Sequence, residues 1–500
     1  MCRTLVLGAT QRIAALGIAC IVCATGCLDM HEPASGTNLL PPVVKSSSLS
    51  RENERPGILG WDDGLQSGRD SVVNGFVFPF SAAQGDTIRL FVTAQTDSVS
   101  VGIYRLGWYQ GTGARLVASH EVESVAQQPA CTAPSPGPSL CPWSETDRFV
   151  VDASWVPGVY IARFATHAGS ARAYPFVVRG PPTPGLLVVL PFNTYEAYNA
   201  WTGASFYVGQ PTYDQRAYKV SFYRPFQGAG LWQRFFTLDY LLVRWLERDG
   251  YNVSYITDYD LHLGRGAGLD AIAWLIAGHS EYWTWQMRSR ASEARDTGVN
   301  LGFLGGNDVY WNTRFETAPA PASAAEVPVL VCYKGSRNDP EYLTEGRSTQ
   351  RFRDYPNNLP ENELIGVMSA AGLGVRNGPV ELVVYDDSDS LFEGTGLTSG
   401  SKLAALAGWE GDRVVENGLT PAGIRVLFQS PYSPVQPPGS TDVLQGTIYR
   451  SGQSRAQVYA SGDVGFEWGL ATYADKTARP GLERFFQNLI SGFVTQRIRR

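Results

Sequence analysis

The chain has 500 residues, about three times the length of one ordinary domain, so it can bury two or more cores. Apolar residues make up 44% and charged residues 18%, a balance that excludes a largely disordered chain. The 41 Lys and Arg residues stand against 47 Asp and Glu residues, which gives a net charge of -6. This acidic balance argues against binding to nucleic acid or to an anionic membrane surface.

Residues 1–26 have the pattern of an export signal. The uncharged run from Ile13 to Thr25 is too short to span a bilayer as a permanent helix. The run ends in Ala24-Thr25-Gly26-Cys27, which resembles the lipobox of bacterial lipoproteins, although Ala24 stands where that motif usually has Leu. We therefore expect a lipid on Cys27 and a place in the bacterial cell envelope, with the membrane contacted through the lipid alone. A secretory signal with an incidental cysteine is the alternative, and the protein would then be secreted.

The remaining cysteines argue for a disulfide and against a thiolate metal site. Cys131 and Cys141 lie ten residues apart in a chain that we expect to be exported, which favours a bond between them. Cys332, between Val331 and Tyr333, is expected to be a buried thiol. After residue 26 the sequence has no CxxC motif and no Cys/His cluster, so a zinc finger is excluded.

Hydrophobic patterns divide the exported chain into three parts. Residues 27–55 have almost no apolar periodicity, which predicts a flexible linker. Residues 56–180 contain short apolar runs between turn residues, a spacing typical of a β-sandwich domain. The strands expected there cover residues 74–79, 86–92, 102–105, 156–163 and 175–178.

Residues 181–500 have the alternating pattern of an α/β domain. Continuous apolar runs at 186–190, 253–257, 271–277 and 301–304 predict strands that are covered on both faces. Residues 238–248 and 284–294 have the spacing of helices between them. This order predicts a doubly wound parallel sheet, flavodoxin-like or glutamine-amidotransferase-like.

Polar and aromatic residues follow all four predicted strands. Ligands of open α/β sheets bind beyond the carboxyl ends of the strands, so these residues are expected to meet in one crevice. A helix N-cap or a turn is the simpler interpretation of Asp258 or Asn307 taken alone. The candidates are His279 and Glu281, with Asn193, Tyr195, Asp258, His262, Asn307 and Trp311 as pocket residues.

Several motifs carry a family resemblance: Tyr223-Arg224-Pro225, Trp245-Leu246-Glu247, residues 257–262, Gly278-His279-Ser280-Glu281-Tyr282-Trp283, residues 305–311, Pro360-Glu361-Asn362 and residues 408–412. They resemble the C-terminal domain of the large (beta) subunit of N,N-dimethylformamidase, over roughly residues 185–495. Upstream, residues 103–109 resemble the β-sandwich that is often joined to such domains in exported bacterial proteins.

The resemblance implies an amidase with a mononuclear iron held by two tyrosines and one glutamate, whose bound water attacks an amide carbon. Phenolate and carboxylate oxygens suit such a hard cation. Tyr282 is the best-matched ligand. Tyr240 is our choice for the second phenol, with Tyr255 and Tyr259 as alternatives, and Glu361 is our choice for the carboxylate, with Glu363 as the alternative.

His279, Glu281 and Glu467 are the candidate catalytic residues in this interpretation. His279 and Glu281 would orient water or shuttle a proton, although Glu281 also suits a first helical turn. Glu467 falls where the family places residues near the pocket. The family's amidase has a His two residues before its metal glutamate, whereas Leu359 stands at that place here.

We therefore expect an exported amidohydrolase acting on a small-molecule amide. The alternative is a surface protein with the same fold that binds carbohydrate or peptide without turnover, through a crevice of aromatic residues such as Tyr198, Trp201 and Trp283. A serine hydrolase using Ser280 is disfavoured because Tyr282 replaces the second glycine of G-x-S-x-G. Homo-oligomerisation and a small accessory subunit are left open.

Overall fold

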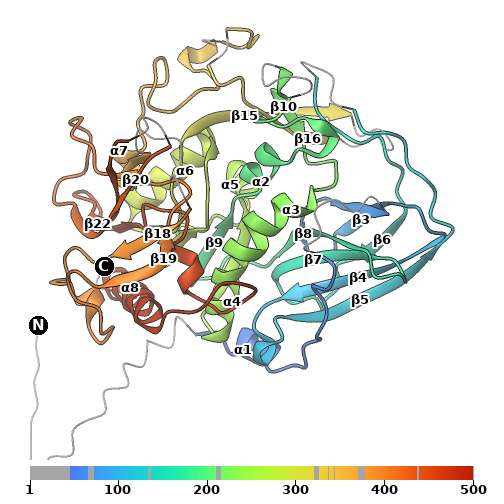
Figure 1. Ribbon diagram of the computed structural model, residues 1–500, viewed down its shortest axis with the longest axis horizontal. Helices are drawn as coiled ribbons and strands as arrows, with labels where there is room; N and C mark the ends of the chain where they lie inside the picture. The colour runs from blue at the N-terminus through green and yellow to red at the C-terminus, as the bar shows by residue number, and fades with distance from the viewer. Residues whose placement is uncertain are drawn as a thin grey trace, which may run out of the picture. The chain divides into compact units, whose positions relative to one another are not determined.

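The computed structural model describes residues 45–65, 72–132, 137–209, 215–319, 326–335, 337–342, 344–369, 378–435 and 439–498. The predicted export signal, Cys27 and most of the predicted linker lie outside these residues. In the described ranges, no helix is long and apolar enough to cross a membrane. The description below follows the element labels of Figure 1.

Two antiparallel-rich sheets make up the N-terminal β region, residues 72–179. One has the order β2 (Ser81–Ala83), β8 (Ala171–Arg179), β7 (Gly158–Ala165), β4 (Ser98–Leu106) and β5 (Ala114–Glu123). The other has the order β1 (Val73–Phe78), β3 (Thr87–Ala94) and β6 (Asp147–Val150). Alternate residues of β3 are buried, as expected for a strand with one covered face. A disulfide joins Cys131 to Cys141 in this region.

A central sheet forms the second part of the molecule. Its order is β11 (Val253–Thr257), β9 (Leu186–Leu190), β12 (Ala273–Ile276), β14 (Asn300–Phe303), β23 (Gln457–Ala460), β22 (Asp442–Arg450) and β21 (Arg425–Tyr432). In this order the strands from β11 to β23 are parallel to one another, and β22 runs antiparallel to both of its neighbours, β23 and β21. The apolar runs of the sequence correctly indicated β9, β11, β12 and β14. Every residue of β9 is buried, because both faces of this sheet are covered.

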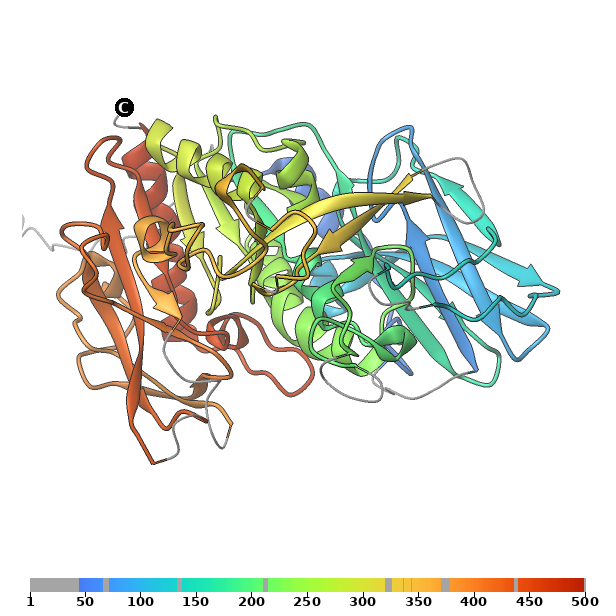
Figure 2. The same ribbon diagram turned by 90° about the horizontal axis from the view of Figure 1, so that it is seen from above.

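Successive residues of β9 enter different cores. Leu187 and Val189 belong to one apolar cluster with residues of α5 (Asp258–Leu263) and α6 (Trp285–Thr297). Leu186 and Val188 belong to another with residues of α4 (Tyr240–Arg248) and α8 (Pro480–Ile498). Figure 2 shows α8, in red, alongside the strands of the central sheet. The chain is thus mixed α/β with several sheets, and the doubly wound and sandwich assignments stay predictions.

The second of these clusters is continuous with the core of the N-terminal β region. It contains Phe76 and Ile103 from that region together with Tyr255 and Leu241 from the central sheet and its helix. Residue 181 therefore separates two patterns of secondary structure that share one core.

Shorter elements complete the fold: η2 (Tyr109–Gly111), α2 (Phe192–Tyr198), η3 (Trp201–Gly203), β10 (Lys219–Ser221), α3 (Gly228–Leu231), the π-helical segment η5 (Trp232–Asp239), β13 (Tyr282–Thr284), β15 (Trp311–Pro319), β16 (Glu326–Val331), η6 (Thr344–Gly346), α7 (Asn362–Ile365), β17 (Met368–Ser369), β18 (Val380–Val383), η7 (Ser390–Phe392), β19 (Lys402–Ala407), β20 (Asp412–Arg413) and η8 (Phe466–Gly469). Strands β10, β16, β15 and β13 form a separate sheet.

The prediction of a flexible linker up to residue 55 is wrong for its last part, because α1 (Ser47–Asn53) is a helix capped by the Ser46 side chain. The apolar periodicity of the sequence did not indicate this helix, because polar side chains bind it to the rest of the molecule. Asn53 is buried and donates to Glu247 Oε2 at 2.8 Å. Its side-chain oxygen Oδ1 accepts from the backbone N–H of Trp108 at 2.7 Å.

A buried ion pair joins the N-terminal β region to α4. The guanidinium of Arg105 donates to both carboxylate oxygens of Glu247, at 2.8 and 2.9 Å, and both side chains are fully buried. Two parallel hydrogen bonds of this kind fix orientation as well as distance. The pair therefore sets how α4 lies on β4.

We expect Glu247→Ala to lower the free energy of unfolding by about 3–5 kcal/mol, because it leaves the Arg105 charge buried without its partner. Urea denaturation followed by circular dichroism measures this change. Glu381→Ala is the matched control, since the Glu381–Lys402 pair is exposed and should contribute less than about 1 kcal/mol. Equal losses in the two variants would contradict the role of the buried pair.

Candidate active site

Two glycines allow the ends of β12 and β14 to approach each other. Gly278 has a φ of 47°, and a Cβ atom there would lie 1.9 Å from Asp239 Oδ1. A Cβ atom on Gly305 would lie 1.6 Å from the Gly278 carbonyl oxygen. Since no real Cβ tolerates such distances, glycine is required at both positions. The chain that follows Gly278 carries His279 and Glu281 into one site.

The imidazole–carboxylate cluster consists of His279, Glu281, Glu410, Tyr198 and Tyr207. His279 Nε2 lies 3.3 Å from Glu281 Oε2 and 3.7 Å from Glu410 Oε1. The Tyr198 hydroxyl lies among them, at 2.9 Å from Glu281 Oε2 and 3.4 Å from both His279 Nε2 and Glu410 Oε1. The ligand atoms of His279, Glu281 and Glu410 all lie within 4.8 Å of one another, so this cluster can hold a metal ion.

Both oxygens of Glu281 accept hydrogen bonds. Tyr207 donates to Oε1 at 2.5 Å, and the indole of Trp311 donates to the same oxygen at 2.9 Å. Oε2 faces Tyr198 and His279. Glu281 is therefore held rigidly as a carboxylate that stabilises a neighbouring positive charge.

Glu410 is more exposed than Glu281, and one of its carboxylate oxygens has only long contacts. Asn307 donates its amide to Oε2, whereas the contacts of Oε1 are 3.4 Å or longer. The side chain of Glu410 is 34% exposed, against 2% for Glu281. Oε1 of Glu410 is thus the carboxylate oxygen of the cluster that is open to a ligand.

His279 is held in its charged form. Its Nδ1 donates to the Gly306 carbonyl oxygen at 2.8 Å, which turns Nε2 toward the two carboxylates. Burial lowers the pKa of His279, but the charges of Glu410 and Glu281 outweigh burial and raise it to about 9. Burial raises the pKa of Glu281, but the hydrogen bond to His279 and the charge of His279 outweigh burial, so the pKa of Glu281 is below its usual value. The two residues form an ion pair at neutral pH.

Two further cations lie on the aromatic rings of the cluster. Lys334 Nζ lies 3.4 Å from the centre of the Tyr207 ring and 4.9 Å from that of Trp311. The Arg234 guanidinium lies 3.8 Å from the centre of the Tyr198 ring. These charges offset the two carboxylates of the cluster.

Tyr282 is fully buried next to this cluster. Its ring contacts Phe206 and Tyr207, and Asn193 donates to its backbone carbonyl at 3.1 Å. Among the described residues, its hydroxyl forms no hydrogen bond of ordinary length and angle, although interaction with the Tyr207 side chain lowers its pKa. Burial and the charge of Glu281 raise the pKa of this phenol well above its ordinary value. The hydroxyl is an unsatisfied donor and acceptor at the site.

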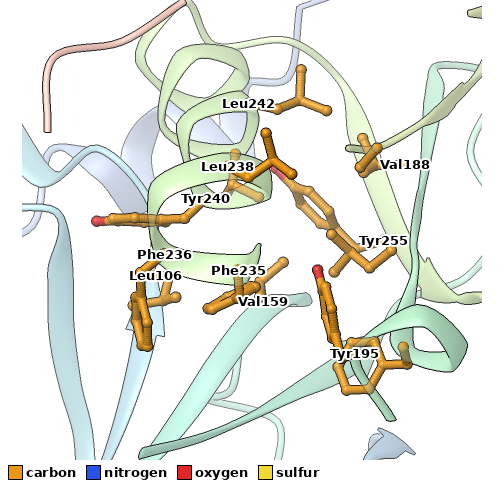
Figure 3. Close-up of a cluster of buried hydrophobic side chains, with 14 of the residues drawn as sticks. Leu106, Val159, Val188, Tyr195, Phe235, Phe236, Leu238, Tyr240, Leu242 and Tyr255 are labelled. Atoms are coloured by element: carbon orange, nitrogen blue, oxygen red, sulfur yellow. The ribbon is translucent and has the colours of Figure 1, made fainter. Parts of the chain in front are cut away.

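The other two predicted metal ligands are engaged elsewhere. The Tyr240 hydroxyl donates to the Gly113 carbonyl at 2.7 Å, and Figure 3 shows this ring pointing away from Tyr195. Glu361 is buried and forms an ion pair with Arg353. No hydrogen bond or ring contact in the described part of the chain joins either residue to Tyr282, so the structure does not bring the predicted iron ligands together.

The alternative metal ligands named from the sequence also contact residues outside the cluster. Tyr255 donates to Glu247 at 3.3 Å, and Tyr259 packs against Phe315. Glu363 pairs with Arg288 and with Arg295. The helical spacing around Tyr240 placed it on α4 but did not indicate that this face of α4 meets the N-terminal β region.

Of the remaining predicted site residues, some contact the cluster and others hold the backbone around it. Asn307 and Trp311 contact the cluster directly. Asp258 accepts from the backbone N–H of Asn193 at 2.8 Å, and Glu467 accepts from that of Gly278 at 3.1 Å. Tyr195 donates to Asp239 beneath Gly278. These residues position the backbone that carries the cluster.

Sequence reasoning missed Glu410, Tyr207 and Lys334 as site residues. Glu410 stands in the segment 408–412 that carried part of the family resemblance, so a signal existed. Tyr207 and Lys334 lie in irregular segments, and no motif pointed to them. Tyr198 had been expected only as one aromatic residue of a binding crevice.

Comparison with known families identifies one match that covers most of the chain. Residues 100–479 match the family model described as N,N-dimethylformamidase beta subunit-like, C-terminal. The chain belongs to this family. The match begins inside β4, well before residue 185, so it includes much of the N-terminal β region. No curated protein matches the chain.

His262 has a structural role that generates a pH prediction. Its Nδ1 lies 2.9 Å from the hydroxyl of Thr284, which caps α6. Burial, and then the charge of Arg290, lower the pKa of His262 to about 4.

Because the unfolded chain binds this proton at higher pH than the folded one, stability is lost as the pH falls from about 6.5 toward 4. We expect wild type to lose about 1 kcal/mol more than His262→Gln between pH 7 and pH 5, after allowance for partial exposure of the ring. Urea titrations at the two pH values measure this difference, and identical losses in both proteins would contradict it.

Proposed function

We propose that this protein is a metal-dependent amidohydrolase of the formamidase type, which cleaves the C–N bond of an amide. The observation that carries the proposal is the convergence of His279, Glu281, Glu410 and Tyr198 beside the unpartnered phenol of Tyr282, in a member of this family. Imidazole, carboxylate and phenol at the ends of parallel strands form a suitable hydrolytic site.

The donor set fits a hard cation such as iron. We assign Glu410, Tyr198 and Tyr282 as the residues that would hold it, because Oε1 of Glu410 is open and the buried Tyr282 hydroxyl would gain the partner it lacks. Glu281 is a poorer donor, since both its oxygens already accept hydrogen bonds. A bound metal ion of this kind polarises an amide carbonyl and acidifies water.

His279 and Glu281 handle the proton in this proposal. The carboxylates of Glu410 and Glu281 favour the protonated form of His279, and its Nε2 is directed into the cluster. It is therefore suited to protonate the leaving nitrogen, while Glu281 stabilises the imidazolium and holds the ring in place. Lys334 and Arg234 keep the cluster from becoming strongly negative.

We also propose that the enzyme is exported and anchored by a lipid on Cys27, a proposal supported by the pattern of residues 13–27. Its substrate would then be an amide that is found outside the cytoplasm.

Two other functions receive less support. In the binding-protein alternative aromatic faces line the crevice, yet Trp283 and Tyr195 are buried. In the serine-hydrolase alternative, Ser280 is 1% exposed and its hydroxyl accepts from the Trp283 indole at 2.9 Å. A buried, occupied hydroxyl is a poor nucleophile.

The ligand assignment predicts different outcomes for two buried phenols. Tyr282→Phe should lose at least about tenfold in metal affinity and in turnover of formamides, because it removes a ligand oxygen. Tyr240→Phe should keep metal and activity and lose about 1 kcal/mol of stability with its bond to Gly113. Elemental analysis of purified proteins and a hydrolysis assay test this pair. Loss of metal in Tyr240→Phe would reverse the assignment.

The division between metal and proton roles predicts a second contrast. Glu410→Gln should lower metal content, whereas His279→Gln should retain metal and lose about 10²–10⁴ in kcat. Activity of the wild type should fall as the pH rises through a value no higher than about 9, since His279 must be protonated. A His279→Gln enzyme with the wild-type alkaline limb would contradict the acid role.

A further inference from the structure

A surface groove is lined in part by residues that neighbour the imidazole–carboxylate cluster in the sequence. It has a volume of about 610 Å³ and lies between the π-helical segment η5, residue Trp409 and the segment that contains Asp475 and Lys476. Trp232 and Gln233 of η5 form one wall, and Trp409 contributes to the lining. We call this the tryptophan groove.

Two chain segments connect the tryptophan groove to the cluster. Gln233 lines the groove and precedes Arg234, whose guanidinium stacks on the Tyr198 ring. Trp409 lines the groove and precedes Glu410. A molecule bound in the groove would therefore lie next to residues that we place at the reacting bond.

The backbone on both sides of the groove has unusual geometry. Residues Trp232–Asp239 form a π-helical segment, a rare arrangement that is frequent at functional sites. Trp409 has a φ of 61°, which is costly for a bulky residue. Its ring packs edge-on against Trp468, at 5.4 Å between centres. Such strain persists where the surrounding structure holds a side chain in a required position.

The size of the groove argues for a substrate larger than a simple formamide. Its volume is within the range of pockets that hold drug-sized ligands. One side of the scissile amide would therefore carry a bulky group that occupies the groove.

The chemistry of the groove favours a sugar ring as that group. The side chains of Trp232 and Trp409 give the lining apolar aromatic surface, and Gln233, Asp475 and Lys476 give it hydrogen-bonding groups, of which Asp475 and Lys476 also pair with each other. A sugar matches both, since its C–H face stacks on an indole and its hydroxyls bind polar side chains. A plain aromatic group would desolvate the Gln233 amide and the Asp475–Lys476 pair without giving them a hydrogen bond in return.

We propose that the tryptophan groove binds the sugar part of an N-acylated amino sugar, whose acyl C–N bond is presented to the cluster. This inference rests on the proposed hydrolase function. In the reaction the oxygen of water bonds to the acyl carbon, the C–N bond breaks, and the nitrogen takes a proton. The products are a carboxylic acid and the free amino sugar, without oxidation or reduction.

Chitotriose, a trimer of N-acetylglucosamine, is a probe for this site, and its binding to the purified full chain is measured by titration calorimetry. Trp232→Ala and Gln233→Ala should each weaken binding at least tenfold. Gln233 is exposed, so its variant is expected to fold normally, and a thermal melt checks this for both proteins.

Trp285→Ala is the matched control. Trp285 stacks on Arg347 at 4.3 Å and lines a different cavity, of about 290 Å³. Its variant should bind chitotriose as the wild type does. The groove assignment is overturned if the wild type does not bind chitotriose, or if the Trp232 and Gln233 variants bind it as tightly as the wild type does. Displacement of the sugar by formanilide, an aryl amide, overturns the choice of a sugar.

An assay for released acetate separates this inference from the proposed function. Binding that depends on Trp232, without acetate release, supports the groove and contradicts the hydrolase. Hydrolysis of formamides by a protein that does not bind chitotriose supports the hydrolase and overturns the groove assignment. Release of acetate that is lost in Glu410→Gln supports both.

Discussion

The site depends on the close approach of two backbone segments at Gly278 and Gly305. No side chain fits between them, and this lets the residues that follow β12 lie against those that follow β14. His279 Nδ1 can then donate to the Gly306 carbonyl, which aims Nε2 at Glu281 and Glu410. Any larger residue at either glycine would separate the segments and remove the orientation of the imidazole.

A second constraint is the charge balance of a nearly closed site. Two carboxylates and one imidazolium have ligand atoms within 4.8 Å of one another, and Lys334 and Arg234 lie on adjacent rings. In such surroundings an unpaired charge is costly, so a change in one charge alters its neighbours. A cation bound here would disfavour the protonated form of His279 by charge repulsion. Ion binding and proton transfer at this site are therefore coupled.

The sequence predicted the parts of the site that regular structure controls. Apolar runs located β9, β11, β12 and β14, and the rule for strand ends led to His279, Glu281 and Asn307. Glu410 was out of reach of that rule, because it follows β19, outside the central sheet. Tyr240 failed for another reason: periodicity shows that a helix has a buried face, but it does not show which neighbour covers each residue. Both errors concern contacts between segments far apart in the chain.

The N-terminal β region takes part in positioning the site. Arg105 and Gly113 of that region bind Glu247 and Tyr240 on α4. Helix α4 continues directly from η5, which carries Trp232 and Arg234 to the groove and the cluster. A shift of α4 on β4 would therefore move one wall of the tryptophan groove together with Arg234 of the cluster. The family match begins within β4, so it includes much of the N-terminal β region together with the central sheet.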